Sequence, residues 1–235
     1  MKKRMGFSNI MPVITAGVLI VSGVIALMTV RDVSQKFIQK STSGNTVVID
    51  AGHGGLDPGK VGINGAYEKD INLSIAKELE KILKDKKCDV IMTRTSDEGL
   101  YNAADANKKM SDMKERIRRM NDSSPDIIIS IHQNSFTSQN SKGAQVFYQT
   151  ESEEGKKCAE FVQRKMAEKL DKNNRRQAKA NSDYYILKKS EKPAIIVECG
   201  FLSNSDEAAL LIDSEYQKKV AGAIAEGVLE YLELQ

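Results

Sequence analysis

The hydrophobic and polar positions of the chain follow two alternating periodicities from residue 46 onward. Short runs rich in β-branched residues predict strands, and longer stretches with an apolar residue at every third or fourth position predict helices between them. This alternation is typical of an α/β domain in which helices cover a sheet. The predicted strands are Val47–Ala51, Asp89–Thr93, Asp126–His132, Ala144–Tyr148, Tyr184–Leu187 and Ala194–Glu198.

Four helices are predicted around these strands. The clearest begins at Asp70, a residue type that favours the N-cap position, and its apolar stripe holds Ile71, Ile75, Leu79, Ile82 and Leu83. The other three cover about Met110–Met120, Glu153–Leu170 and Glu215–Leu234. The polar and basic segment Leu170–Asp183 is predicted to be a loop.

The first 45 residues follow a different pattern. Residues 10–30 contain no charged side chain. A helix of this length can cross a bilayer core of about 30 Å. Three basic residues at positions 2–4 precede this run, so the N-terminus is expected in the cytoplasm and the rest of the chain outside. We therefore expect a basic tail at 1–9, a transmembrane anchor at 10–30, a tether at 31–45 and one domain at 46–235.

A cleavable signal peptide is the competing interpretation of the same segment. The apolar run is longer than the usual ~7–15 residues, and no clear A-x-A cleavage site follows it. These two features favour an anchor, or an uncleaved signal, that stays attached to the domain.

Charge and cysteine content exclude several classes of protein. The chain of 235 residues has a formal net charge of +3, but residues 1–40 hold six basic side chains and one acidic one, which leaves the remainder at −2. A nucleic-acid-binding domain needs a basic surplus for phosphate contacts, so that class is excluded.

The cysteines are odd in number, far apart and outside any C-x-x-C pair, which predicts three unpaired thiols: Cys88, Cys158 and Cys199.

Polar residues follow three of the predicted strands at the point where each strand ends. His53 lies in the glycine-rich turn after the first strand, and His132 and Glu198 close two later strands. Ligands of open α/β sheets bind just outside such strand ends. A lone histidine there is usually structural, but the chain has two histidines and both take equivalent positions, which indicates a shared site.

Two imidazoles at one site favour zinc, which in catalytic sites takes three protein ligands and leaves a position for water. Glu68 is the best third ligand, because it directly precedes the first helix and a loop from His53 can bring it back. Alternatively, Glu68 is an acidic residue at the helix start, where its negative charge interacts favourably with the helix dipole. Asp50 and Asp57 are rival ligands. Asp50 is expected to orient a metal-binding residue rather than to bind the metal itself.

Glu198 is a carboxylate at the end of a buried strand, where a charge must find a partner or be neutralised. Across from a metal, it could take a proton from zinc-bound water and pass it to a leaving nitrogen. The alternative is a structural ion pair with Arg94. A Cys199 nucleophile with a histidine base is a weaker hypothesis, because a buried thiol at a strand end lacks an evident activating environment.

Four segments carry a resemblance to a known family: VVIDAGHGGLDPGKVGINGAYEKDINLSIAKEL, VIMTRTSD, DIIISIHQNS and PAIIVECGFLSNSDE. From about Thr46 to Leu232 the chain resembles the zinc-dependent N-acetylmuramoyl-L-alanine amidases of the Amidase_3 type. These enzymes cut the bond between the lactyl group of muramic acid and the first L-alanine of the stem peptide. The resemblance implies a mixed, largely parallel sheet with helices on both faces. It also implies zinc ligands His53, Glu68 and His132, and Glu198 as the catalytic carboxylate.

The layout of anchor, tether and bare domain resembles the CwlD-type spore-cortex amidases. Those enzymes strip stem peptides from muramic acid so that a deacetylase can form muramic-δ-lactam, which germination enzymes recognise. The resemblance implies a peptidoglycan substrate and a functional link to a muramic acid deacetylase. From the N-terminal segment we expect the domain on the extracytoplasmic side, either anchored to the membrane or secreted.

One departure from the family pattern concerns the segment before the last strands. The family usually has Asn-Arg-Gly where this chain has Asn174-Arg175-Arg176, so the loop near the glycan is expected to differ. From this we form the hypothesis that an activator protein orders the site before zinc binds. Two other functions remain as alternatives: a zinc peptidase that acts within the stem peptide, and a metal-free, membrane-anchored wall-binding protein.

Overall fold

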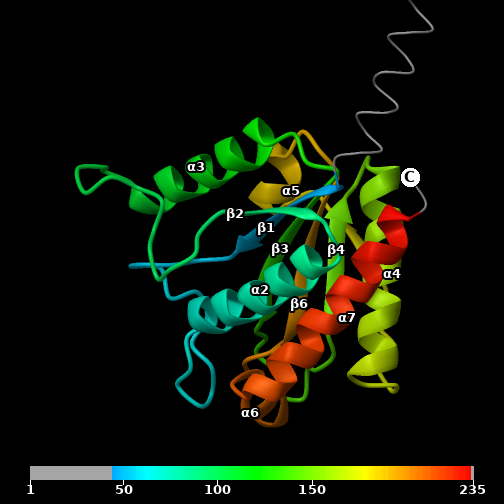
Figure 1. The fold of residues 1–235 in the computed structure, drawn as a ribbon. Coiled ribbons are helices and arrows are strands. Elements are labelled where there is room, and N and C mark those ends of the chain that lie inside the picture. Colours follow the sequence, from blue (N-terminus) through cyan, green and yellow to red (C-terminus); the bar gives the residue numbers. More distant parts are fainter. Residues whose placement is uncertain (1–43, 234–235) are drawn as a thin grey trace, which may run out of the picture. The chain divides into compact units, whose positions relative to one another are not determined.

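Residues 44–233, which the computed structural model describes, contain one mixed sheet of six strands in the order β2-β1-β3-β6-β4-β5 (Figure 1). Neighbouring strands run parallel except for β4 and β6, which are antiparallel. The predicted mixed, largely parallel sheet is therefore confirmed. The strands are β1 Thr46–Ala51, β2 Asp89–Met92, β3 Ile127–Asn134, β4 Gln145–Gln149, β5 Lys179–Asn181 and β6 Ala194–Phe201.

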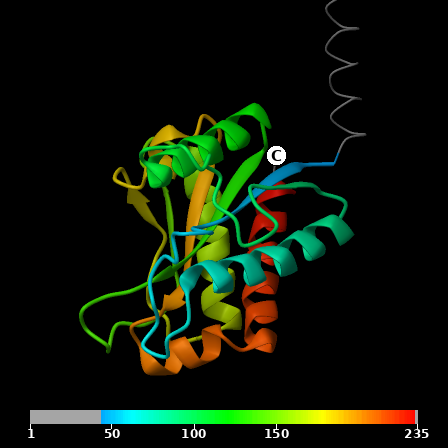
Figure 2. The ribbon, with the colours of Figure 1, turned by 90° about the vertical axis from the view of Figure 1, so that its left-hand side faces the viewer.

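Helices cover both faces of this sheet, as the family resemblance implies (Figures 1 and 2). The helices α2 (Glu68–Asp85), α4 (Glu153–Lys169) and α7 (Ser214–Leu232) pack on one face, where they enclose the larger hydrophobic core. The helices α3 (Lys108–Asp122) and α5 (Tyr185–Lys189) cover a smaller core on the other face. A further helix, α6 (Ser205–Leu211), follows β6 and was not among the predicted elements.

The pleat of the three central strands decides which polar side chains share a face. Side chains alternate between the two faces along a strand. Val48, Ile128 and Ile196 belong to the smaller core under α3 and α5. The residues at even spacing from them on the same strands are Asp50, Ser130, His132 and Glu198, so all four lie on the α3/α5 side of the sheet.

The first helix begins two residues earlier than predicted, and the predicted N-cap at Asp70 is wrong. Its N-cap is Tyr67, which makes no side-chain cap hydrogen bond. Backbone carbonyls of the preceding loop replace the cap: the Glu68 amide donates to the carbonyl of Lys60, and the Lys69 amide donates to that of Pro58. The loop therefore satisfies amides that a helix start otherwise leaves unpaired. The predicted apolar stripe is buried at four of its five positions and partly buried at Ile82.

The predicted strand Tyr184–Leu187 is wrong, because this segment begins the short helix α5. An apolar run of four residues fits either a strand or a buried helical turn. Here Ile186 and Leu187 are buried against the sheet from within the helix. The predicted loop Leu170–Asp183 instead contains β5, whose three residues pair with β4. So short and polar a strand has no periodicity to reveal it.

The other predicted helices are present with small shifts at their ends, and the three cysteines are buried and unpaired as expected. In the described part of the chain, no helix combines the length and the apolar character that crossing a bilayer requires. The predicted basic tail and anchor, and the tether up to residue 43, lie outside the described residues.

Candidate metal and catalytic site

The site begins at the turn after β1, where His53 takes a left-handed backbone conformation with φ of 63°. Two buried arginines hold this turn. The Arg94 guanidinium donates to the carbonyls of Ala51 at 2.8 Å and Gly52 at 3.1 Å, and Arg116 donates to the carbonyls of Ala51 and His53. A Cβ atom on Gly52 would lie 2.3 Å from the His132 imidazole, so the glycine leaves room for that ring.

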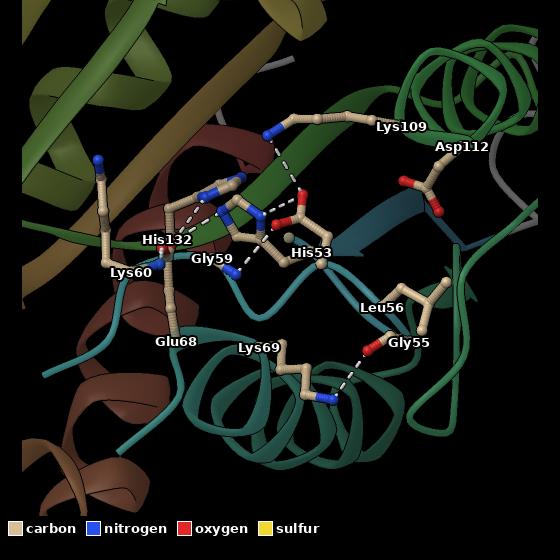
Figure 3. Close-up of polar contacts among 12 residues, drawn as sticks. His53, Gly55, Leu56, Gly59, Lys60, Glu68, Lys69, Lys109, Asp112 and His132 are labelled. Carbon is tan, nitrogen blue, oxygen red and sulfur yellow. Dashed lines mark hydrogen bonds and ion pairs between the residues drawn. The ribbon is translucent and has the colours of Figure 1, made fainter. Parts of the chain in front are cut away.

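The structure brings together the three residues that the sequence singled out as metal ligands (Figure 3). The Glu68 carboxylate lies between two imidazoles, with Oε1 at 2.9 Å from Nδ1 of His132 and Oε2 at 3.3 Å from Nε2 of His53. One ligand atom from each residue lies within 4.8 Å of the other two. Two nitrogens and one oxygen in this arrangement are a donor set that suits zinc.

The Glu68 side chain is 2% exposed, and its position is determined by the backbone around it. The Lys60 amide donates to Oε2 at 2.8 Å, and the Gln133 amide donates to Oε1 at 3.1 Å. Burial works to raise the pKa of Glu68, but hydrogen bonds from His132 and His53 hold it well below its ordinary value. Glu68 is therefore an anion that serves the site as well as the first turn of α2.

Asp57, rather than Asp50, is the carboxylate that orients a histidine. Its Oδ2 lies 3.0 Å from Nδ1 of His53 and 3.4 Å from Nζ of Lys109. Asp50 points instead into the α3 side of the sheet, where its hydrogen-bond partners are Thr93, Arg116 and Ser130. Asp50 therefore makes no hydrogen bond to either histidine in the described residues, and its link to the turn at His53 runs through Arg116. Because Asp57 occupies Nδ1, Nε2 of His53 is the atom that faces Glu68.

Glu198 lies on β6 directly opposite His132 on β3, and it is 6% exposed. Its Oε1 accepts a hydrogen bond of 3.2 Å from the Tyr184 hydroxyl, and its Oε2 has no hydrogen-bond partner among the described residues. Burial raises the pKa of Glu198, and the nearby Glu68 charge raises it further, whereas His132 opposes the shift. The donors of Arg94 all contact backbone carbonyls, so the alternative ion pair between Arg94 and Glu198 is not formed.

A cavity of about 110 Å³ adjoins the two histidines between the sheet and the helices α3 and α5. Apolar side chains make up much of its wall, and they include Met113, Ile186 and Ile196. Tyr184 also lines it. Sequence reasoning missed Tyr184 as a site residue because it assigned this segment to a strand, and a single tyrosine in an apolar run carries no further signal.

The loop that departs from the family pattern is firmly attached to the sheet. Arg176 donates to the carbonyl of Lys142 at 2.8 Å and to Oε1 of Gln145 at 3.0 Å. Its guanidinium also lies 4.7 Å from the centre of the Phe201 ring, within the range of a cation–π contact. The arginine that replaces glycine therefore connects this loop to β4 and β6.

Cys199 is fully enclosed one residue after Glu198, and burial raises the pKa of its thiol well above the ordinary value. A nucleophilic cysteine needs a stabilised thiolate. The environment of Cys199 therefore gives no support to the cysteine-nucleophile hypothesis.

Comparison with known proteins agrees with this geometry. Residues 47–230 match the family model described as N-acetylmuramoyl-L-alanine amidase, Amidase_3. The germination-specific N-acetylmuramoyl-L-alanine amidase of Bacillus subtilis is 38% identical over 192 residues, which cover 80% of each chain. The CwlD amidase of Clostridioides difficile, solved in complex with the GerS lipoprotein, superposes with a TM-score of 0.80 at 36% identity and covers 82% of this chain and 100% of that one. The amidase AmiC2 of Nostoc punctiforme has a TM-score of 0.70 at 31% identity, with 80% and 97% covered.

Proposed function

The chain belongs to the N-acetylmuramoyl-L-alanine amidase family, and from this premise we propose that it cleaves peptidoglycan with one zinc ion held by His53, Glu68 and His132. In this proposal Glu198 is the carboxylate that transfers the proton. The observation that carries it is the convergence of three ligand atoms within 4.8 Å, beside a buried carboxylate with one unpartnered oxygen.

The residues fit a catalytic zinc ion by their chemistry. Two imidazoles and one carboxylate match the three protein ligands of a zinc site that keeps an open position. Metal-binding histidines and carboxylates also need hydrogen-bond partners behind them. Asp57 is such a partner for His53, and the amides of Lys60 and Gln133 are partners for Glu68. Both the donor types and their supports therefore favour zinc.

The chemistry of the reaction assigns each residue a task. When bound, zinc would polarise the scissile carbonyl and lower the pKa of water to about 7. Glu198 takes a proton from the attacking water and gives it to the alanine nitrogen as the C–N bond breaks. The products are the lactyl carboxylic acid of muramic acid and a stem peptide with a free N-terminal L-alanine. A pKa raised by burial makes Glu198 a better proton acceptor than an exposed carboxylate, which suits a group that must take a proton and then pass it on.

The setting that we propose is the spore cortex. The support is similarity to the germination-specific amidase of Bacillus subtilis and to the CwlD amidase of Clostridioides difficile. In this setting, peptide removal from muramic acid precedes deacetylation and closure of muramic-δ-lactam, so the chain acts together with a muramic acid deacetylase. Cortex from spores that lack the protein is then expected to contain no muramic-δ-lactam.

We propose further that the domain acts on the extracytoplasmic side and is attached to the membrane through residues 10–30. The uncharged run and the basic residues before it support this topology. An activator protein is part of the proposal, because the CwlD amidase was solved together with the GerS lipoprotein. Equilibrium dialysis tests this point: full zinc occupancy and activity of the chain alone would remove the need for an activator.

Mass spectrometry of digested peptidoglycan tests the reaction itself. The full-length chain with zinc and an activator lipoprotein is expected to release stem peptides that begin at L-alanine, and to leave muramic acid without peptide. Fragments cut inside the stem peptide would identify a peptidase instead. No product even with zinc and the activator added would favour a wall-binding protein without catalysis.

The Glu198→Gln variant separates catalysis from metal binding. It is expected to lower turnover by roughly 10²- to 10⁴-fold, the usual contribution of a proton-transferring group, while zinc content stays at one ion per chain. A variant that cuts at a near-normal rate would refute the role of Glu198.

A further inference from the structure

Tyr184 lies between β5 and α5, and its hydroxyl donates a hydrogen bond to Oε1 of Glu198. We propose that Tyr184 is a positioning residue of the amidase, which holds one oxygen of the Glu198 carboxylate and thereby leaves the other to exchange the proton. This inference rests on the catalytic role proposed for Glu198.

The two oxygens of Glu198 have different surroundings. Oε1 accepts the hydrogen bond from Tyr184 at 3.2 Å, whereas Oε2 is buried and has no partner within residues 44–233. A buried polar atom without a partner is costly, so it indicates a functional acceptor. In the described residues, Tyr184 is also the side chain that restrains the rotation of this carboxylate, since Arg94 is engaged with carbonyls.

The ring of Tyr184 is itself held in place. Its backbone amide and that of Asp183 donate to Oδ1 of Asn181, the last residue of β5, at 2.9 and 2.8 Å. The ring meets the Phe147 ring of β4 edge to face, with centroids 5.4 Å apart. Two strand residues thus determine where the hydroxyl points, which makes it a rigid support for Glu198.

The position of Tyr184 also connects this support to the reacting atoms. Tyr184 lines the same cavity as His53 and His132. Because Glu198 is buried, its hydrogen bond with Tyr184 is stronger than the same bond in water. An error of about 1 Å in the placement of a catalytic group can cost about 100-fold in rate, so one bond that prevents rotation of the carboxylate has a kinetic effect.

The Tyr184→Phe variant tests the proposal, because it removes the hydroxyl and keeps the ring against Phe147. We expect kcat of the full-length chain on peptidoglycan to fall roughly 10- to 100-fold, with KM and zinc affinity unchanged and the melting temperature only a few degrees lower, as the loss of one hydrogen bond predicts. Introduced into Glu198→Gln, the same change should cause no further loss, since the carboxylate that it orients is already absent.

Tyr148→Phe is the matched control, because Tyr148 is the next residue of β4 after Phe147 and packs against the larger core on the opposite face. It should keep normal kcat.

If Tyr184→Phe keeps normal kcat while Glu198→Gln is inactive, the positioning role fails and the proposed function stands. A fall in zinc affinity, or a loss of kcat no larger than the loss of folded chain, would assign Tyr184 a structural role and also overturn the proposal. An active Glu198→Gln would refute the proposed catalytic role of Glu198, on which this inference rests.

Discussion

Asp50 and Arg116 form a buried ion pair beneath the candidate metal site. Their charged atoms are 2.7 Å apart, and both side chains are almost completely buried. Thr93 and Ser130 donate to the same carboxylate, and Arg116 also donates to the carbonyls of the turn at His53. The carboxylate oxygens of Asp50 and the guanidinium nitrogens of Arg116 all have hydrogen-bond partners, which is the condition under which a buried ion pair is tolerated. The pair therefore supports the turn at His53 from within the wall of the cavity that adjoins the two histidines.

This pair predicts a specific dependence of stability on pH. Burial alone would raise the pKa of Asp50, but the Arg116 charge and two hydroxyl donors lower it from 3.8 to about 2. A depressed pKa in the folded state means that the stabilisation is complete above pH 3.8 and is lost as the pH falls through 2. The contribution is about 2 kcal/mol.

The Asp50→Asn variant isolates that contribution. At neutral pH it should be less stable than the wild type by about 2–3 kcal/mol, because Arg116 loses the charge-assisted hydrogen bond to Asp50 and keeps only Asp112 as a charged partner. Between about pH 4.5 and pH 2 this deficit should shrink by about 2 kcal/mol, as only the wild type loses the pair. Urea unfolding of both chains across this range measures it. A deficit that does not change with pH would contradict the prediction.

At the scale of elements, α7 packs between α2 and α4 on the larger core. Gly227 is the point of closest approach to α4: a Cβ atom there would lie 2.6 Å from Cα of Val162 and 2.7 Å from its amide nitrogen. These are backbone atoms, which cannot turn aside as a flexible side chain could. By contrast, a Cβ atom on Gly222 of the same helix would have no neighbour within 4 Å.

Two alanine substitutions in α7 should therefore have opposite effects. Gly227→Ala is expected to lower the free energy of unfolding by about 1–3 kcal/mol, because α7 must move away from α4. Gly222→Ala should raise it by up to about 1 kcal/mol, since alanine favours a helix over glycine. Thermal or urea unfolding of the two variants compares them directly. Equal effects of the same sign would show that the close contact between Gly227 and α4 does not determine the change in the free energy of unfolding.

At the scale of the whole molecule, the candidate ligands come from three separate parts of the chain. His53 follows β1, Glu68 begins α2, and His132 lies on β3. A ligand that binds only the folded state stabilises it by mass action. A zinc ion bound to these side chains would therefore stabilise the domain as well as serve the reaction.

Metal removal tests this link. Zinc at 100 times its dissociation constant should raise the free energy of unfolding by about 2.7 kcal/mol, and a chelator should reverse the increase. The His132→Ala variant, which lacks one ligand, should respond to neither. Differential scanning calorimetry of both chains gives the comparison. A melting temperature of the wild type that is independent of zinc would argue against metal binding at this site.

The sequence by itself determined the parts of the protein that depend on local pattern. The central strands β1, β3 and β6 are apolar runs that end in polar residues, so their positions and the candidates His53, His132 and Glu198 could be read directly. Glu68 could be proposed as well. A zinc ion bound by two histidines needs a third protein ligand, and Glu68 lies just before a predicted helix, where a loop from His53 can bring it back. The helix stripes followed from their periodicity in the same way.

Only the tertiary structure decided which groups surround those candidates. The pleat of β1 turns Asp50 toward Arg116, and the turn after it brings Asp57 to His53, which no local pattern indicates. β5 exists because β4 offers a pairing edge, and Tyr184 reaches Glu198 because α5 forms where a strand was expected. The physical reason is that hydrogen bonds and packing between distant segments override the weak preference of a short run.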